Sequence, residues 1–254
     1  MTLPAEVEAI TSQYLSLTDE QLPGRVRGFY LTGSIPVGDL HPGRSDIDGV
    51  VVDEPVTEDD VRPIHEMLPE RPYFDVTYLT AAALAAPPDH STPVVHTING
   101  EFKDPASAGT VTLVLWSEMA RQSLAVCEVP GLVVHDDHQA LVEHTRHNLT
   151  SYWEVKLGKL STAVAERPAD EVLAGWIIPW FVLGIPRLHA LLATGNIVSK
   201  TAAGGHGAAA YSSYSGLCRR AIDHRAGADV VFTAADATQG VAFGRTVIVS
   251  AAGI

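Results

Sequence analysis

The stretch that most constrains the fold runs from Tyr30 to Val52 and places a Gly-Ser pair and two aspartates between two apolar runs. Gly33 and Ser34 directly follow the first run, and Asp46 and Asp48 open the second. Because side chains alternate between the faces of a strand, both aspartates are predicted to share one face. Neighbouring carboxylates repel unless a cation lies between them, and Mg²⁺ held by carboxylates and substrate phosphates is common in phosphoryl-transfer sites. The stretch therefore predicts two strands that bring a divalent-metal site beside a Gly-Ser turn.

The Gly-Ser turn is also a candidate phosphate site. Gly33 lets the backbone approach a ligand closely, and Ser34, at the start of a short helix, would offer a hydroxyl and N–H groups to a phosphate. The loop that follows is rich in helix breakers and must fold back to deliver Asp46. Arg44, just ahead of the aspartate pair, could reach a triphosphate or could be an ordinary solvated loop residue.

A third strand is predicted from Pro72 to Leu79, where apolar and polar residues alternate. Asp75 lies between apolar neighbours, which is costly for a carboxylate unless it is hydrogen-bonded, bound to a metal or facing a cleft. The alternative is an aspartate on an edge strand that faces water. Helices are predicted from Pro4 to Leu17, behind the sheet, and from Thr57 to Leu68. The first part of the chain is therefore expected to form a small fold with a mixed sheet.

The second part of the chain is predicted to be mostly helical. Pro105 and the small residues after it suggest a boundary, so two domains are expected, residues 1–106 and 107–254. The tail from residue 226 gives mixed signals, with strand-like composition near its two ends. The fold class is α+β. The predicted helices are Thr110–Glu128, Asp136–Leu160, Asp170–Thr194 with breaks at Pro179 and Pro186, and Thr201–Arg225.

Composition narrows the class of partner. The 254 residues carry a formal net charge of -13, which argues against a nucleic-acid substrate and gives weak support to a cationic acceptor. Cys127 and Cys218 show no metal spacing, and the N-terminus shows no secretory signal, so a cytoplasmic location is expected. The most apolar stretch, residues 175–192, contains two prolines, an arginine and a histidine, which suits buried helices better than a membrane span. We expect a monomer without a membrane or nucleic-acid partner.

Two segments carry a resemblance to known proteins. The Gly33-Ser34 turn followed by Asp46-Ile47-Asp48 resembles the nucleotidyltransferase superfamily that includes DNA polymerase β. The run from Gly184 to Lys200, with its Thr-Gly-Asn-Ile turn, resembles aminoglycoside 3''-O-adenylyltransferases, the streptomycin and spectinomycin resistance enzymes. The match covers residues 30–80 and 184–207, is diffuse between them and is absent from the tail.

The resemblance implies an N-terminal nucleotidyltransferase domain, a C-terminal helical domain and an active site between them. It implies transfer of AMP from ATP to a hydroxyl of an aminoglycoside-type antibiotic, with two Mg²⁺ ions. Asp46, Asp48 and Asp75 would hold the metal, and Asp75 would also accept the proton of the hydroxyl. The residues that would bind ATP are Gly33, Ser34, Arg44, Arg187 and Lys200.

The acceptor site departs from the family pattern at three positions. Asp75 stands where the 3'' enzymes use Glu, so the shorter arm must come closer to its hydroxyl or act through water or metal. Phe102 takes roughly the place of a tryptophan that lines the streptomycin pocket, and Ile177 falls where the family carries an acidic residue that binds drug. Glu101, beside Phe102, is a further candidate contact. These differences weaken the case for streptomycin more than the case for adenylyl transfer.

Two alternatives remain open from the sequence. One is a nucleotidyltransferase that modifies a protein hydroxyl, as in toxin–antitoxin pairs, or another small metabolite. The other is a relative that binds nucleotide or drug without turnover, against which the complete carboxylate set argues.

Overall fold

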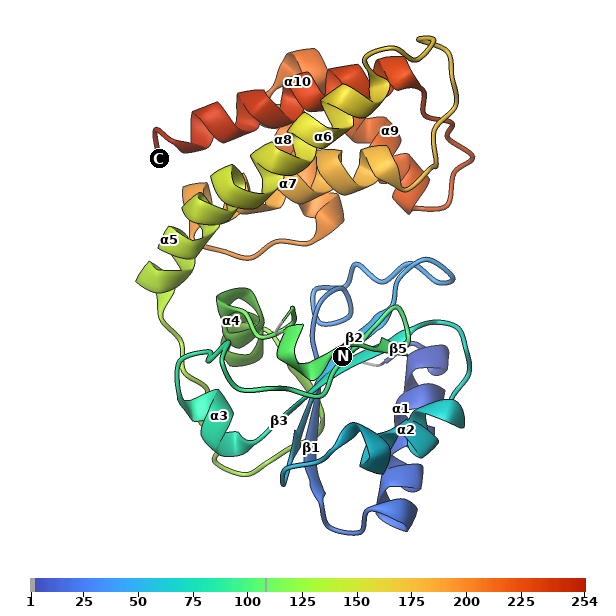
Figure 1. The fold of residues 1–254 in the computed structure, drawn as a ribbon, viewed down its shortest axis with the longest axis vertical. Coiled ribbons are helices and arrows are strands. Elements are labelled where there is room, and N and C mark those ends of the chain that lie inside the picture. The colour runs from blue at the N-terminus through green and yellow to red at the C-terminus, as the bar shows by residue number, and fades with distance from the viewer. Residues whose placement is uncertain (1–2, 108) are drawn as a thin grey trace. The chain divides into compact units, whose positions relative to one another are not determined.

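The computed structural model describes residues 3–107 and 109–254, and the chain divides into two compact units, residues 1–137 and 138–254 (Figure 1). The boundary predicted between residues 106 and 107 therefore falls inside the first unit. The reason is that the segment after it supplies a helix and a fourth strand, Leu124–Cys127, which pairs with the first strand of the sheet.

The first unit is built on a mixed four-stranded sheet. Its strands are β1 (Val26–Leu31), β2 (Ile47–Asp53), β3 (Phe74–Leu79) and β6 (Leu124–Cys127), in the order β3-β2-β1-β6. β1 runs antiparallel to both of its neighbours, whereas β2 and β3 are parallel. The α+β class with a mixed sheet is confirmed.

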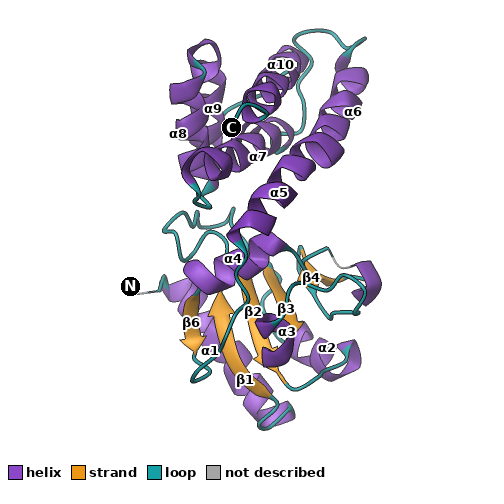
Figure 2. Ribbon diagram, turned by 90° about the vertical axis from the view of Figure 1, so that its left-hand side faces the viewer, coloured by secondary structure: helices purple, strands orange, loops and turns teal. Residues whose placement is uncertain are grey.

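Helices cover both faces of this sheet (Figure 2). α1 (Ala5–Gln21) and α2 (Glu58–Glu66) pack on the face formed by alternate residues such as Phe29, Val51 and Phe74. α3 (Ala81–Ala85) and α4 (Leu113–Arg121) pack on the opposite face, with Tyr30 and Val50. The even-numbered residues of β2 and the odd-numbered residues of β3 therefore point to the α3–α4 side.

Two segments of the first unit differ from the sequence-based expectation. The helix predicted from Thr110 to Glu128 ends at Arg121, and residues 124–127 form β6 because they complete the ladder of β1. The segment after β3, where no helix or strand is predicted from the sequence, holds α3, a short 3-10 turn (Pro105–Ser107) and a hairpin of β4 (Thr97–Ile98) and β5 (Glu101–Phe102).

The second unit is helical. It contains α5 (His138–Asn148), a π-helical turn (Leu149–Trp153), α6 (Glu154–Val164), α7 (Ile177–Thr194), α8 (Lys200–Ala210), a 3-10 turn (Ser212–Tyr214), α9 (Ser215–Arg225) and α10 (Ala234–Ala251). α7 packs against α5, α8, α9 and α10 and is the centre of the unit. Within residues 3–107 and 109–254, α7 is also the one helix long and apolar enough to cross a membrane, and 56% of it is buried in the protein.

Three expectations for the helical unit need correction. Pro179 and Pro186 do not interrupt α7: Pro179 lies in the first turn, where its missing N–H costs little, and Pro186 is accommodated inside the helix. The helix predicted over residues 201–225 is two helices separated at Tyr211. The tail is not strand-like at its end, because a capping box at Thr233 and Asp236 opens α10.

Candidate functional site

The Gly-Ser pair lies in a turn directly after β1. Gly33 adopts a φ of 65°, in the left-handed region that favours glycine. The turn is closed by hydrogen bonds from Gly38 N to the Ile35 carbonyl (3.1 Å) and from Asp39 N to the Ser34 carbonyl (2.9 Å). It does not continue into the short helix expected at Ser34, because Pro36 and Gly38 disfavour one.

The carboxylate of Asp48 lies against the backbone of Gly33. A Cβ atom added to Gly33 would approach Oδ2 of Asp48 to within 2.4 Å, so any larger residue there would collide with this carboxylate. The backbone amide of Thr32 donates to the carbonyl of Asp48 at 2.9 Å. The β1–β2 pairing thus brings the Gly-Ser turn and Asp48 into direct contact.

Two of the three candidate carboxylates are paired across neighbouring strands. Asp48 of β2 stands in register with Asp75 of β3, and registered residues of adjacent strands point to the same face about 5 Å apart. Asp46 immediately precedes β2, and all three residues are partly exposed. The structure therefore brings Asp48 and Asp75 together on the α3–α4 face of the sheet, near the N-terminal ends of β2 and β3.

Asp75 is held by the turn of the β4–β5 hairpin. The backbone amides of Asn99 and Gly100 each donate to one oxygen of its carboxylate at 2.8 Å. Sequence reasoning missed this contact, although an Asn-Gly pair between two short strands is a strong hairpin signal and could have revealed it. One of the environments expected for Asp75, a hydrogen-bonded carboxylate, is therefore the one observed.

The carboxylates do not form a three-residue metal cluster. Over residues 3–107 and 109–254, no set of three or more His, Cys, Asp or Glu side chains is arranged to hold a metal ion. Asp46 and Asp48 still fit Mg²⁺, which is often bound by one or two carboxylates and completed by water and substrate phosphates.

The remaining candidates of the first unit are Arg44, Glu101 and Phe102. Arg44 is exposed in the turn before Asp46. Glu101 is exposed and pairs with Lys103 (Oε2 to Nζ, 2.6 Å). Phe102 packs on His65, with ring centroids 4.8 Å apart, on the α1–α2 side of the sheet, whereas Asp75 points to the opposite side.

Three candidates belong to the second unit. Arg187 of α7 donates from Nε to the carbonyl of Val198 at 3.0 Å and so ties down the turn after Gly195. That glycine ends α7 with a φ of 75°, in the left-handed region that favours glycine. Lys200 is the first residue of α8, which Ser199 caps, and Ile177 is the first residue of α7 and is partly buried.

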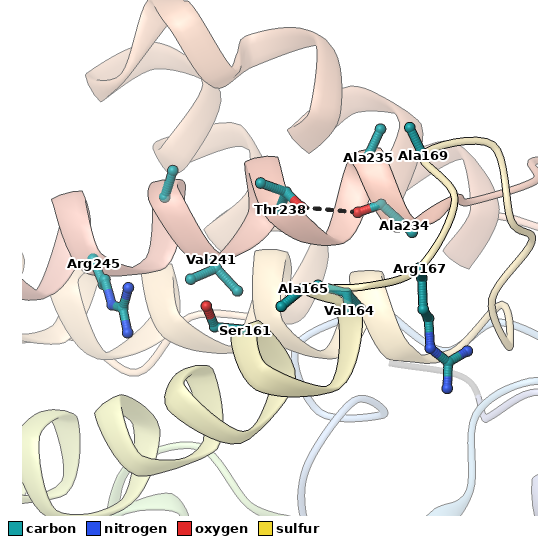
Figure 3. A pocket seen from close by; sticks show the side chains of 11 residues that line it. Ser161, Val164, Ala165, Arg167, Ala169, Ala234, Ala235, Thr238, Val241 and Arg245 are labelled. Atoms are coloured by element: carbon teal, nitrogen blue, oxygen red, sulfur yellow. Dashed lines mark hydrogen bonds between the residues drawn. The ribbon is translucent and has the colours of Figure 1, made fainter.

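A cavity of about 450 Å³ lies between α6 and α10 of the helical unit (Figure 3). Its lining includes Val164, Val241 and two arginines, Arg167 and Arg245, which pair with Glu171 and Glu154. None of the predicted site residues lines it, so the cavity gives no support to the candidate site.

Comparison with known proteins gives a fold and no family. No protein-family model matches the chain, and no curated protein sequence matches it. The structure is similar to a crystal structure of spectinomycin adenyltransferase AAD(9) from Enterococcus faecialis with ATP and spectinomycin. The TM-score is 0.63 over 95% of this chain and 98% of that chain, at 14% sequence identity. The likeness shows that the chain has the fold of that protein along nearly its whole length.

Proposed function

We propose that this protein transfers AMP from ATP to a hydroxyl group of an aminoglycoside-type antibiotic such as spectinomycin. The observation that supports it most is the contact of Asp48 with Gly33 together with its register with Asp75, in a chain whose fold resembles spectinomycin adenyltransferase. A Gly-Ser turn and acidic residues from two strands are the parts that nucleotidyl transfer requires: a place for phosphates, ligands for a metal and an acceptor for a proton.

The reaction balances with these parts. The acceptor oxygen forms a bond to the α-phosphorus of ATP while the bond from that phosphorus to the bridging oxygen breaks and pyrophosphate leaves. The proton of the acceptor hydroxyl passes to Asp75, directly or through water. Each oxygen of a carboxylate has two acceptor positions, so the hydrogen bonds from Asn99 and Gly100 leave room for this proton.

Asp46 and Asp48 would hold Mg²⁺ together with the phosphates of ATP, for which two ions are proposed. Bound there, the metal would offset the negative charge of the phosphates and polarise the α-phosphoryl group. Gly33 and Ser34 would bind phosphate through the turn, and Arg44, Arg187 and Lys200 would add the positive charge that a triphosphate near carboxylates needs. Glu101 and Ile177 are proposed contacts for the acceptor, whereas Phe102, which packs on the side of the sheet opposite to Asp75, is not.

The test is to incubate the protein with ATP, Mg²⁺ and a panel containing spectinomycin and streptomycin. Pyrophosphate release and a drug mass increased by one AMP group are expected. Asp48→Asn should lower kcat/KM by about 10²–10³-fold, because it removes charge at the centre of the site. Asp59→Asn, an exposed aspartate in the first turn of α2, is the matched control and should leave activity unchanged.

The outcomes distinguish an error in the identity of the acceptor from an error in the assignment of the reaction. No product with any drug, but AMP on a protein hydroxyl, would move the acceptor to a protein and keep the transfer reaction. Full activity of Asp48→Asn would refute the assignment of the site itself.

A further inference from the structure

The β4–β5 hairpin is attached firmly to the strand that carries Asp75. The hydroxyl of Thr97 accepts from the backbone amide of Val76 (2.9 Å) and donates to the carbonyl of Phe74 (3.0 Å). These two hydrogen bonds flank Asp75 on both sides along β3. The position of the hairpin is therefore fixed relative to the backbone of Asp75.

The turn of this hairpin has a backbone shape that few residues can adopt. Asn99 has a φ of 56° and Gly100 a φ of 73°, so two successive residues are left-handed, and Asn99 is the one such non-glycine residue within 3–107 and 109–254. This shape turns both amides toward the Asp75 carboxylate. Asparagine tolerates the left-handed region and β-branched residues do not.

The contact acts against the repulsion within the site. Asp48 and Asp75 are registered like charges on adjacent strands, an arrangement that destabilises a sheet. Two N–H donors supply partial positive charge to the Asp75 carboxylate and offset part of this repulsion. They also fix both of its oxygens toward the hairpin, while Asp48 lies against Gly33.

We propose that the Asn99–Gly100 turn positions the carboxylate of Asp75 to accept the proton of the acceptor hydroxyl. Held by the turn, Asp75 does not join Asp46 and Asp48 in binding the metal. This inference rests on the proposed function. It replaces the expectation that all three carboxylates bind the metal with a metal site made by Asp46 and Asp48 alone. It also gives Asp75, whose side chain is shorter than the glutamate of the 3'' enzymes, a fixed location.

The first experiment is independent of activity. Both turn residues are exposed, so their amides should exchange rapidly with solvent unless Asp75 holds them. In amide hydrogen exchange followed by NMR, the Asn99 and Gly100 amides should be protected in the wild-type protein and lose that protection in Asp75→Ala. Rapid exchange of both amides in the wild type would overturn the proposal.

The second experiment compares two variants of one residue, Asn99→Val and Asn99→Gly. Valine resists the left-handed backbone, so Asn99→Val should lower kcat by about 10–100-fold with the KM for ATP within about twofold of wild type. Asn99→Gly keeps the backbone shape and should retain near-wild-type kcat. A merely structural turn would change the thermal midpoint of Asn99→Val and leave the kcat of the folded protein unaltered, and that result would refute the positioning role.

A third measurement separates Asp75 from the metal pair. MgATP binding, followed by calorimetry without acceptor, should be weakened in Asp48→Asn and unchanged in Asp75→Ala. Equal weakening in both variants would place Asp75 among the metal ligands and overturn the division. If the wild-type protein modifies no acceptor while its turn amides are protected, the proposed function fails and the catalytic role of the turn with it, whereas the hairpin contact stands.

Discussion

The two units differ in the side chains that they bury around their central elements. Behind the sheet of the first unit, the hydroxyl of Tyr14 donates to that of Tyr78 (3.0 Å), which lies 2.8 Å from Nε2 of His65. Asp53, at the end of β2, is 4% exposed, and its Oδ2 has no hydrogen-bond partner. The first unit therefore keeps titratable groups in its core.

The helical unit is packed through small residues. A Cβ on Gly204 would lie 2.6 Å from Leu183, and one on Gly244 would lie 2.8 Å from both Ile185 and Leu157. Glycine lets these helices approach closely around an apolar core. The helical unit also buries a histidine, His189 of α7, whose Nδ1 lies 2.8 Å from Nε2 of His206. What distinguishes this unit is the close approach of its helices, so its stability should depend strongly on side-chain volume, whereas that of the first unit should depend strongly on protonation.

The largest expected effect is a core truncation in the helical unit. Phe243 of α10 is fully buried and contacts the rings of Tyr211 and Tyr214, so Phe243→Ala should cost about 3–5 kcal/mol of unfolding free energy. Urea unfolding followed by tryptophan fluorescence measures it, and the cost should be equal at pH 5 and pH 7. Val249→Ala, 75% exposed on the same helix, should stay within about 0.5 kcal/mol. A loss below about 1 kcal/mol for Phe243→Ala would contradict the comparison.

The second prediction concerns proton linkage in the first unit. Burial raises the pKa of Asp53 to about 7, from 3.8, and burial together with the charge of Arg62 lowers the pKa of His65 to about 4, from 6.5. A raised carboxyl pKa contributes stability that is fully present below pH 3.8 and lost as the pH rises toward 7. A lowered histidine pKa contributes stability that is present above pH 6.5 and lost as the pH falls toward 4. The two dependences oppose each other and nearly cancel between about pH 4 and 6.5.

Removing either group should reveal the pH dependence that the other group gives to stability. Asp53→Asn leaves the histidine dependence, so the first unit should lose about 1.4 kcal/mol per pH unit as the pH falls from 6.5 to 4. His65→Gln should show the opposite slope, with stability falling as the pH rises from about 4 toward 7. The fluorescence of Trp116, the single tryptophan of the first unit, reports the unfolding. Equal slopes in both variants would refute the linkage.

The third prediction tests the tight helix contacts. Gly244→Ala places a methyl group against Ile185 and Leu157 and should cost about 1–3 kcal/mol. Thermal unfolding measured beside the wild type gives the change. An unchanged midpoint would show that α10 can shift without penalty.

The smallest expected effect is an increase in stability. Gly158 lies in the middle of α6 and its added Cβ would meet nothing within 4 Å, so Gly158→Ala should stabilise by about 0.5–1 kcal/mol through helix propensity alone. If Gly158→Ala and Gly244→Ala change stability alike, close approach is not what the glycines of this unit provide.

Local patterns predicted much of the first unit. The strand from the alternation in residues 72–79, the helix that opens after Thr57, and the strand after Asp46 each appear as expected. The contact of Asp75 with the hairpin amides joins residues 24 and 25 positions apart, so its partners are set by tertiary pairing that no local period encodes.

The helical unit was harder to predict for the same reason. Residues 245–250 are β-branched in part and read as strand, yet they continue a helix whose start is fixed at Thr233 and whose face is buried on α7. Packing outweighs intrinsic propensity there. Pro186 likewise looks like a break and is tolerated inside the buried helix.

The contact between the carboxylate of Asp48 and the backbone of Gly33 limits which residues can replace either one. A larger residue at position 33 would collide with the carboxylate of Asp48 whatever the turn binds, so glycine is required there for folding as long as Asp48 is present. Glycine at residue 33 and aspartate at residue 48 are therefore expected to be kept or replaced together.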